Sequence, residues 1–294
     1  MPTLAPTKPI ARSATVNGEK VAYWEWRPSV SANATTMIFA HATGFHSRTY
    51  DAIIESFPEH RIISVDMHGH GRSEGGPVSS WQTVIDKMAT LLKALNVKKA
   101  VGVGHSMGGH VLAHCAGERP DLFTHLILFD PVIFDPAMFK DSASGSGKGE
   151  PHPAIRRKRD FANPEAMMER FRGRDPYSLF ETRAFEDYCR FGLTETADGL
   201  GYELACPPEV EASYYGASRT NPGIHEAMTK IEAKTLVVRA KPLGKMDFKG
   251  SPTWPDLANH IPGATDLPRY DRTHFHPFED SADAANIIRD FLAK

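Results

Sequence analysis

The residues best suited to chemistry lie in the run GHSMGG at residues 104–109. This run directly follows an apolar string at residues 99–104 and opens a helical pattern, so it predicts a sharp turn from a strand into a helix. The flanking glycines lack the Cβ atoms that would clash in the strained backbone of such a turn. We therefore predict that Ser106 is a nucleophile at the carboxyl end of a sheet, the alternative being a turn that only packs the helix on the strand.

A serine hydroxyl is a weak nucleophile until a neighbouring base takes its proton. Such a base is expected late in the chain, where the sequence YDRTHFH occupies residues 270–276 just before a closing helical stretch. We predict that His274 is this base. His276 would face the other way in an extended segment and is expected to pack or to face solvent.

The base needs an acid that fixes its tautomer and stabilises the imidazolium, and two aspartates compete for this role. Asp130 ends the apolar string at residues 125–130 and would stand at the same sheet edge as Ser106, although Pro131 also allows a turn role. Asp247 lies in the loop after the next string, whose first four residues hold no acid. We favour Asp130 and keep Asp247 as the alternative.

Two backbone N–H groups are predicted to hold the oxyanion that forms when the nucleophile attacks a carbonyl. One belongs to Met107, at the start of the helix that follows Ser106. The other is expected from the loop HATGF at residues 41–45, where small residues allow close approach of a substrate, and Thr43 is our candidate. His41 is expected to hold this loop by hydrogen bonds rather than to take part in the reaction.

The elements that must position these residues are short apolar strings that alternate with amphipathic stretches, which predicts right-handed βαβ units and a mostly parallel sheet covered by helices. The expected strands are TTMIFA (35–40), RIISVD (61–66), KAVGVG (99–104), HLILFD (125–130) and KTLVVRA (234–240). The expected helices cover residues 49–57, 81–95, 107–118 and 281–292. An antiparallel hairpin with Asn17-Gly18 as its turn is expected over residues 13–26.

This alternation breaks at residues 133–231, which predicts a helical lid inserted between a first core part, 1–132, and a second core part, 232–294. The insertion opens with a loop-like run at residues 141–153, followed by the charged segments IRRKRD, PEAMMERFRGR and TRAFEDYCRFGL, which we expect to be helical. The cationic run at residues 156–159 is expected to be a solvated helix face rather than an anion site. The insertion is rich in large apolar side chains: Phe134, Phe139, Met167, Met168, Phe171, Tyr177, Phe180, Phe185, Tyr188 and Phe191.

Composition argues against several other classes of protein. A net charge of −2 over 294 residues gives no reason to expect nucleic acid, and no apolar run is long enough to span a membrane. The cysteines Cys115, Cys189 and Cys206 show neither disulfide nor zinc-site spacing. His110 and His114 are expected to pack rather than to bind metal, and no phosphate or dinucleotide loop is present, so we expect no cofactor and no metal. We expect a cytoplasmic protein, with a peroxisomal location left open.

The chain resembles the α/β-hydrolase fold family over nearly its whole length. The resemblance rests on the order of HATGF, DMHGHGRS at residues 66–73, GHSMGG, a lid insertion and a late histidine. Within the family, HATGF, FDPVIF and THFHPF are similar to fungal toxin-biosynthesis and peroxisomal lipase-like hydrolases. In such relatives an acid after the sixth strand can serve the histidine, which favours Asp130. The missing acid directly after the string at residues 234–240 departs from the usual pattern.

These residues together predict a serine hydrolase that cleaves an ester, lactone or thioester of a hydrophobic small molecule through an acyl-enzyme on Ser106. The expected partner is thus a small-molecule ester or lactone, and a homodimer is allowed. Two other classes stay open. One is a non-hydrolytic acyltransferase or cyclase of secondary metabolism, and the other is a ligand receptor that retains the three residues. The fold hosts many chemistries, so the substrate is not predicted further.

Overall fold

An eight-stranded sheet forms the centre of the protein, whose computed structural model describes residues 8–28, 35–140, 152–242 and 249–294. The strand order is β1-β2-β4-β3-β5-β6-β10-β11, and all neighbouring strands from β4 to β11 pair in parallel, whereas β2 pairs antiparallel with both β1 and β4. The predicted fold class is therefore confirmed. The strands are β1 (Ile10–Val16), β2 (Glu19–Trp26), β3 (Thr36–Ala40), β4 (Arg61–Val65), β5 (Ala100–His105), β6 (Phe123–Phe129), β10 (Lys234–Ala240) and β11 (Thr265–Arg269).

The five apolar strings form strands β3, β4, β5, β6 and β10 in the middle of the sheet, and their side chains are buried on both faces. The predicted hairpin is β1-β2, and its turn residues Asn17 and Gly18 have φ of 50° and 83°, as a tight hairpin turn of the primed type requires. Strand β11 was not predicted, because its sequence TDLPR lies at the sheet edge and carries no apolar string.

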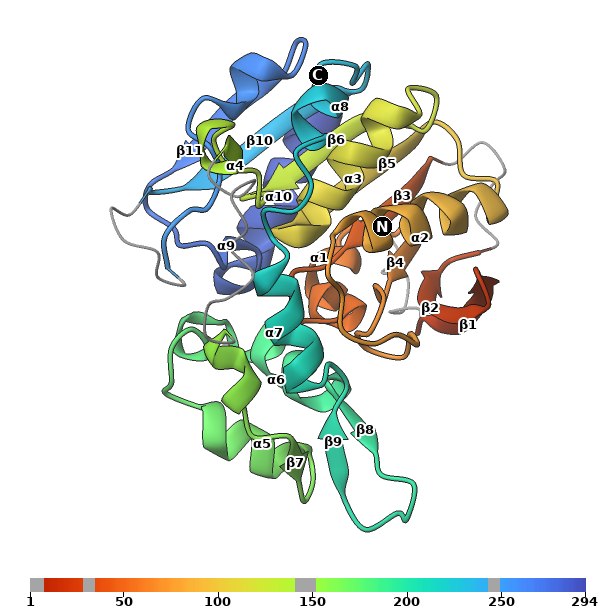
Figure 1. The fold of residues 1–294 in the computed structure, drawn as a ribbon, viewed down its shortest axis with the longest axis vertical. Helices are drawn as coiled ribbons and strands as arrows, with labels where there is room; N and C mark the ends of the chain where they lie inside the picture. Colours follow the sequence, from red (N-terminus) through yellow and green to blue (C-terminus); the bar gives the residue numbers. More distant parts are fainter. Residues whose placement is uncertain (1–7, 29–34, 141–151, 243–248) are drawn as a thin grey trace, which may run out of the picture.

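Helices cover both faces of the sheet (Figure 1). On one face, α2 (Gln82–Ala94), α3 (Met107–Glu118) and α8 (Ile224–Met228) share a core that includes Ile38 and Leu128. On the other face, α1 (Asp51–Ile54), α9 (His276–Glu279) and α10 (Ser281–Leu292) pack on the alternate strand side chains. The helix predicted at residues 49–57 is a 3₁₀ turn, η1 (Ser47–Tyr50), that continues into the short α1.

Most of the chain between β6 and β10 forms a lobe beyond one end of the sheet, seen in the lower half of Figure 1. Its elements are η3 (Pro153–Arg156), β7 (Asp160–Phe161), α5 (Pro164–Phe171), η4 (Tyr177–Leu179), α6 (Thr182–Phe191), β8 (Leu193–Glu195), β9 (Tyr202–Leu204) and α7 (Pro208–Gly216), with α8 leading back to the core. Helix α4 (Ala137–Lys140) precedes the lobe in the chain and is drawn in the upper half of Figure 1. Residues 141–151, where a loop was predicted, lie outside the described residues.

The lobe differs from the predicted helical lid in two respects. Besides helices it contains a three-stranded antiparallel sheet of order β7-β9-β8. The prediction of a helix at IRRKRD is wrong, because this segment runs from the end of η3 to the start of β7. Arg157 is accordingly not on a solvated helix face but is 17% exposed and paired with Glu211. The predicted boundaries of the insertion, residues 133 and 231, stay a prediction. Helix α8 lies within these boundaries but packs on α3 in the core.

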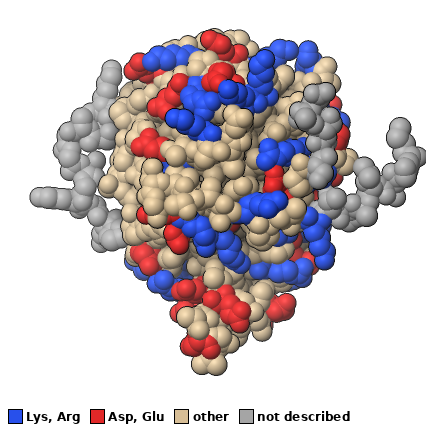
Figure 2. Space-filling model, turned by 90° about the vertical axis from the view of Figure 1, so that its right-hand side faces the viewer, with Lys and Arg blue, Asp and Glu red and all other residues tan. Residues whose placement is uncertain are grey.

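Charged side chains of both signs are interspersed over the face that Figure 2 shows, in keeping with the small net charge. Among the described residues, no helix combines the length and the apolar character needed to cross a bilayer.

Candidate active site

Ser106 occupies the sharp turn between β5 and α3, with φ of 57° and ψ of −118°. A residue with a side chain rarely adopts positive φ, and such strain is typical of functional sites. The neighbouring glycines permit the turn. A Cβ on Gly108 would lie 2.1 Å from the carbonyl oxygen of Ala40 in β3, and one on Gly104 would lie 2.6 Å from the carbonyl oxygen of Gly108. The start of α3 thus packs closely against β3 and against the end of β5.

The structure brings Ser106, His274 and Asp130 together from three separate segments. His274 Nε2 lies 3.0 Å from Ser106 Oγ, and His274 Nδ1 lies 2.5 Å from Asp130 Oδ2. Asp130 follows β6, and His274 lies between β11 and α9. Because a carboxylate only accepts hydrogen bonds, the proton sits on Nδ1 and leaves Nε2 to accept from the serine hydroxyl. A base is therefore held in the correct tautomer beside the hydroxyl.

Asp130 is buried and surrounded by donors. Its Oδ1 accepts hydrogen bonds from the Ala240 N–H at 3.0 Å and from Ser251 Oγ at 2.5 Å. Thr253 Oγ1 lies 3.2 Å from the same oxygen and 2.8 Å from the Pro131 carbonyl oxygen, which share its one proton. Burial alone would raise the pKa of Asp130, but the hydrogen bonds and the facing His274 outweigh it, so the pKa lies below its ordinary value. The carboxylate is thus charged at neutral pH. Asp247, the alternative acid, lies outside the described residues.

His105 and Tyr50 hold the backbone of His274, a support that was not predicted. The Nε2 of His105 donates to the His274 carbonyl oxygen at 2.8 Å, and the Tyr50 hydroxyl lies 3.0 Å from Nδ1. Burial lowers the pKa of His105 to about 3, so the ring is neutral and can accept at Nδ1. His105 belongs to the GHSMGG motif, but no local pattern in the sequence links it to Tyr50 or to His274.

The loop after β3 adjoins the start of α3, and histidines hold it in place. His70 Nε2 accepts the Gly44 N–H at 3.0 Å, and His41 bonds to Ala42 O at 2.8 Å and to the Met67 N–H at 2.9 Å. Thr43 Oγ1 lies 3.4 Å from Met107 Sδ, so the two residues predicted to bind an oxyanion are neighbours. Within the described part of the chain, neither the Thr43 N–H nor the Met107 N–H donates a hydrogen bond. Both groups can therefore serve a ligand.

A cavity of about 690 Å³ opens in front of Ser106, between the core and the lobe. This volume suits a small organic molecule. Ser106, His274 and Thr43 lie in its wall. The wall also contains four charged residues, Arg157, Arg174, Asp175 and Glu211, and seven aromatic residues: Phe45, Trp81, Phe134, Phe171, Tyr177, Tyr215 and Phe275. Of the apolar lobe residues singled out in the sequence, Phe134, Phe171 and Tyr177 thus face the cavity, and the side chain of Phe139 is outside the description.

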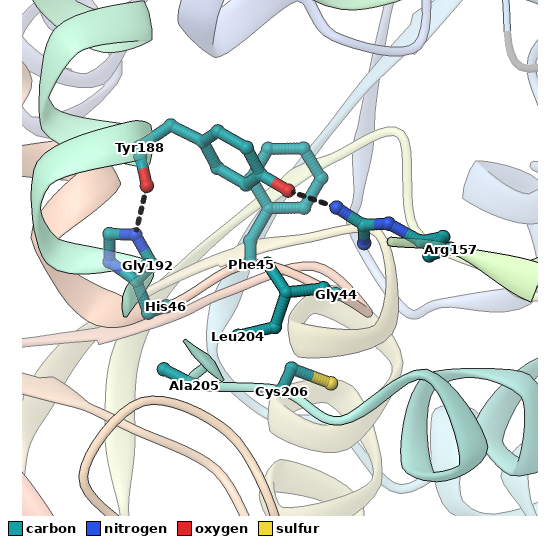
Figure 3. Close-up of a pocket in the computed structure, with 9 residues that line it drawn as sticks. All are labelled: Gly44, Phe45, His46, Arg157, Tyr188, Gly192, Leu204, Ala205 and Cys206. Carbon is teal, nitrogen blue, oxygen red and sulfur yellow. Dashed lines mark hydrogen bonds between the residues drawn. The ribbon is translucent and has the colours of Figure 1, made fainter. Parts of the chain in front are cut away.

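Behind the Thr43 loop the packing between core and lobe is close. A void of about 10 Å³, enough for a single water molecule, lies between Gly44, Phe45, His46 and the strand residue Leu204 (Figure 3). His46 Nε2 bonds to the Tyr188 carbonyl oxygen at 3.1 Å across it. The lobe is therefore tied directly to the loop that carries Thr43.

The remaining histidines singled out in the sequence make other contacts. His110 Nε2 and His114 Nδ1 lie 2.8 Å and 3.0 Å from the Asn221 amide nitrogen. His276 Nε2 lies 2.7 Å from Asp283 Oδ2, away from Ser106. These contacts account for the three rings as packing residues.

Several known proteins that are similar to this chain in sequence or structure are hydrolases. The model of the "Alpha/beta hydrolase family" matches residues 37–239. A lipase of Mycobacterium tuberculosis is 31% identical over 147 residues, which are 50% of this chain and 52% of that protein. A peroxisomal α/β-hydrolase of Saccharomyces cerevisiae has a TM-score of 0.76 at 14% identity, covering 99% of this chain and 90% of that one. An enol-lactonase of Burkholderia xenovorans has a TM-score of 0.66 at 20% identity, covering 96% and 100%. The chain spans about half or less of the length of curated relatives that it matches.

Proposed function

The chain belongs to the alpha/beta hydrolase family, and on this premise we propose that it is a serine hydrolase. Its substrate is an ester, lactone or thioester of a small, largely apolar molecule. The observation that carries this proposal is the continuous hydrogen-bonded chain from Ser106 Oγ through His274 to Asp130, with distances of 3.0 Å and 2.5 Å. This arrangement is the one that acyl transfer through a serine requires.

In this mechanism, Ser106 Oγ attacks the carbonyl carbon while His274 Nε2 takes its proton. Asp130 stabilises the imidazolium that forms, and the backbone N–H groups of Thr43 and Met107 hold the oxyanion. The imidazolium then gives its proton to the departing alcohol or thiol, which leaves an acyl group on Ser106. Water, deprotonated by the same histidine, attacks the acyl-enzyme and releases the acid.

The cavity supports a small-molecule substrate rather than a macromolecular one. The aromatic residues of its wall provide apolar contact area, and its volume of about 690 Å³ limits the size of the bound molecule. On the face that Figure 2 shows, the described Lys and Arg side chains are interspersed with Asp and Glu, which supports a partner other than nucleic acid.

The proposal predicts turnover of a panel of phenyl esters, lactones and alkyl thioesters, followed by release of free acid. Product analysis by mass spectrometry, with and without an added alcohol acceptor, separates hydrolysis from acyl transfer. Ser106→Ala should abolish turnover of every substrate that the wild type cleaves. Formation of an ester of the acceptor with no free acid would instead favour an acyltransferase, and tight binding of esters without turnover would favour a receptor.

A further inference from the structure

A largely buried polar cluster lies in the wall of the cavity on the side of the lobe. It consists of Arg157, Glu211, Tyr177 and Tyr188, of which the first three line the cavity. Arg157 pairs with Glu211 through Nη1 and donates from Nη2 to the hydroxyls of Tyr177 at 3.1 Å and Tyr188 at 2.7 Å. The side chains of Arg157 and Glu211 are only 17% and 7% exposed. Charges so deeply placed are costly, so their position beside a ligand cavity needs a reason.

The cluster borders the loop that carries Thr43. A Cβ on Gly44 would lie 2.6 Å from Glu211 Oε1, so the carboxylate rests on the backbone next to Thr43. The ring of Phe45 lies 5.0 Å from that of Tyr188, tilted by 51°, and the Tyr188 hydroxyl bonds to Arg157 as seen in Figure 3. A substrate carbonyl bound by the Thr43 N–H would therefore have the polar cluster close by, and the atoms next to that carbonyl would face it.

The cluster has one hydroxyl proton available for a hydrogen bond to a ligand. The two tyrosine hydroxyls already accept from Arg157, and the 3.0 Å contact between them uses only one of their two protons. Tyr188 is buried away from the cavity, whereas Tyr177 lines it, so the unused proton belongs to Tyr177 and is directed to the cavity. Burial raises the pKa of Tyr177, so the hydroxyl keeps this proton at neutral pH. No acceptor for it is recorded in the described part of the chain.

The charge of the cluster then selects the kind of acceptor. The positive charge of Arg157 is cancelled by Glu211, so a carboxylate bound to Tyr177 would gain no net attraction from the cluster. The other two charged lining residues, Arg174 and Asp175, are exposed to solvent, which screens their charges. A neutral oxygen, such as a ketone or a hydroxyl, accepts from Tyr177 without the desolvation cost of a buried charge. The acyl part of the substrate is the part that stays in the cavity after Ser106 is acylated, so a donor built into the wall serves it in both steps.

We propose, on the basis of the proposed hydrolysis at Ser106, that the substrate carries a second neutral oxygen function in its acyl part, a few bonds from the scissile carbonyl, and that Tyr177 binds it. The rest of the acyl part lies on the apolar wall around Trp81 and Phe134. Tyr177 is thus a specificity-determining residue, and simple alkanoyl esters are poorer substrates than their oxo counterparts.

The test compares kcat/KM for phenyl heptanoate with kcat/KM for phenyl 3-, 4- and 5-oxoheptanoate, in the wild type and in Tyr177→Phe. For each enzyme, kcat/KM for the oxo ester is divided by kcat/KM for the plain ester. Comparing this ratio between the wild type and the variant cancels the intrinsic reactivity of the esters and any difference in the folded fraction. Loss of one hydrogen bond to a neutral acceptor should lower this ratio about tenfold for at least one isomer. The variant keeps the ring that packs on Phe171 at 4.7 Å.

Tyr188→Phe is the matched control, because it removes a hydroxyl from the same guanidinium without facing the cavity. Its ratio should equal that of the wild type. Hydrolysis of the plain ester with the same ratio in wild type and Tyr177→Phe would overturn the inference while leaving the proposed hydrolase intact. Failure of the folded wild type to hydrolyse any of these esters would contradict the hydrolase itself, and the inference would fall with it.

Discussion

At the scale of single residues, Asp130 is the side chain whose role can be tested most sharply. Asparagine keeps its volume and can still accept from Ala240 N–H and Ser251, but it presents an amide to His274 Nδ1 and no longer fixes the tautomer. We expect Asp130→Asn to lower kcat by about 10⁴-fold with the fold preserved. Steady-state kinetics on the best ester, with circular dichroism for folding, provide the measurement.

Asp247→Asn is the natural control, because Asp247 is the competing acid in the sequence. Its kcat should stay close to that of the wild type. The assignment of Asp130 would be wrong if Asp247→Asn lost turnover and Asp130→Asn retained it.

The sequence contains the signals for Ser106, His274 and Asp130 but not for the residues that hold them. Ser106 stands in a motif whose glycines have a steric purpose, and Asp130 ends a strand that neighbours the one before Ser106. Ser251, Thr253 and Tyr50 reach the site only through tertiary packing. Ser251 and Thr253 lie 121 and 123 residues from Asp130 in the sequence, and Tyr50 lies 55 residues from His105. No spacing rule connects such distant residues.

At the scale of elements, the position of Ser106 depends on the close approach of α3 to β3. The Cβ introduced by Gly108→Ala would meet backbone atoms of Ala40, which cannot move aside as a flexible side chain would. We expect this variant to lower the free energy of unfolding by about 1–3 kcal/mol, the usual cost of overpacking, and to lower turnover as Ser106 shifts. Urea denaturation and steady-state kinetics provide the two measurements.

Gly216→Ala, at the end of α7, is the matched substitution, since a Cβ there meets nothing within 4 Å. It should be neutral or slightly stabilising, because alanine favours the helix over glycine. Equal stability of the Gly108→Ala and Gly216→Ala variants would contradict the steric role given to Gly108.

The elements that could be predicted are those whose pattern is set by burial in the core. Central strands such as β4 and β5 are covered by helices on both faces, so they read as apolar strings. Strand β11 pairs only with β10 and is largely exposed, and β7, β8 and β9 have two or three residues each, so none of them carries a periodic signal. Their pairing depends on the rest of the fold.

At the scale of the whole molecule, buried neutral histidines make stability depend on pH. Burial lowers the pKa of His105 and His110 to about 3 and that of His46 to about 4. Above pH 6.5 these rings are neutral in both the folded and the unfolded chain. Below it, the unfolded chain binds protons that the folded state excludes, so each ring should lower the free energy of unfolding by about 1.4 kcal/mol per pH unit as the pH falls toward 4. Urea denaturation from pH 8 to pH 5 measures this slope.

His110→Gln removes one of these rings and should make the mean slope between pH 6.5 and pH 5 shallower by about 1 kcal/mol per pH unit, because the unfolded ring is only half protonated at pH 6.5. An unfolding free energy that is constant over this range in the wild type would mean that these rings are protonated in the folded protein. The neutral state assigned to His105 would then be incorrect.

In the whole molecule, Ser106, His274 and the buried Asp130 come together beside the cavity between the core and the lobe. The most direct test of this arrangement is the intact mass of the protein after exposure to a fluorophosphonate, measured beside Ser106→Ala. We predict one covalent adduct on the wild type and none on the folded variant. An adduct that persists in Ser106→Ala, or a folded wild type that forms no adduct, would contradict the assignment of Ser106 as the nucleophile.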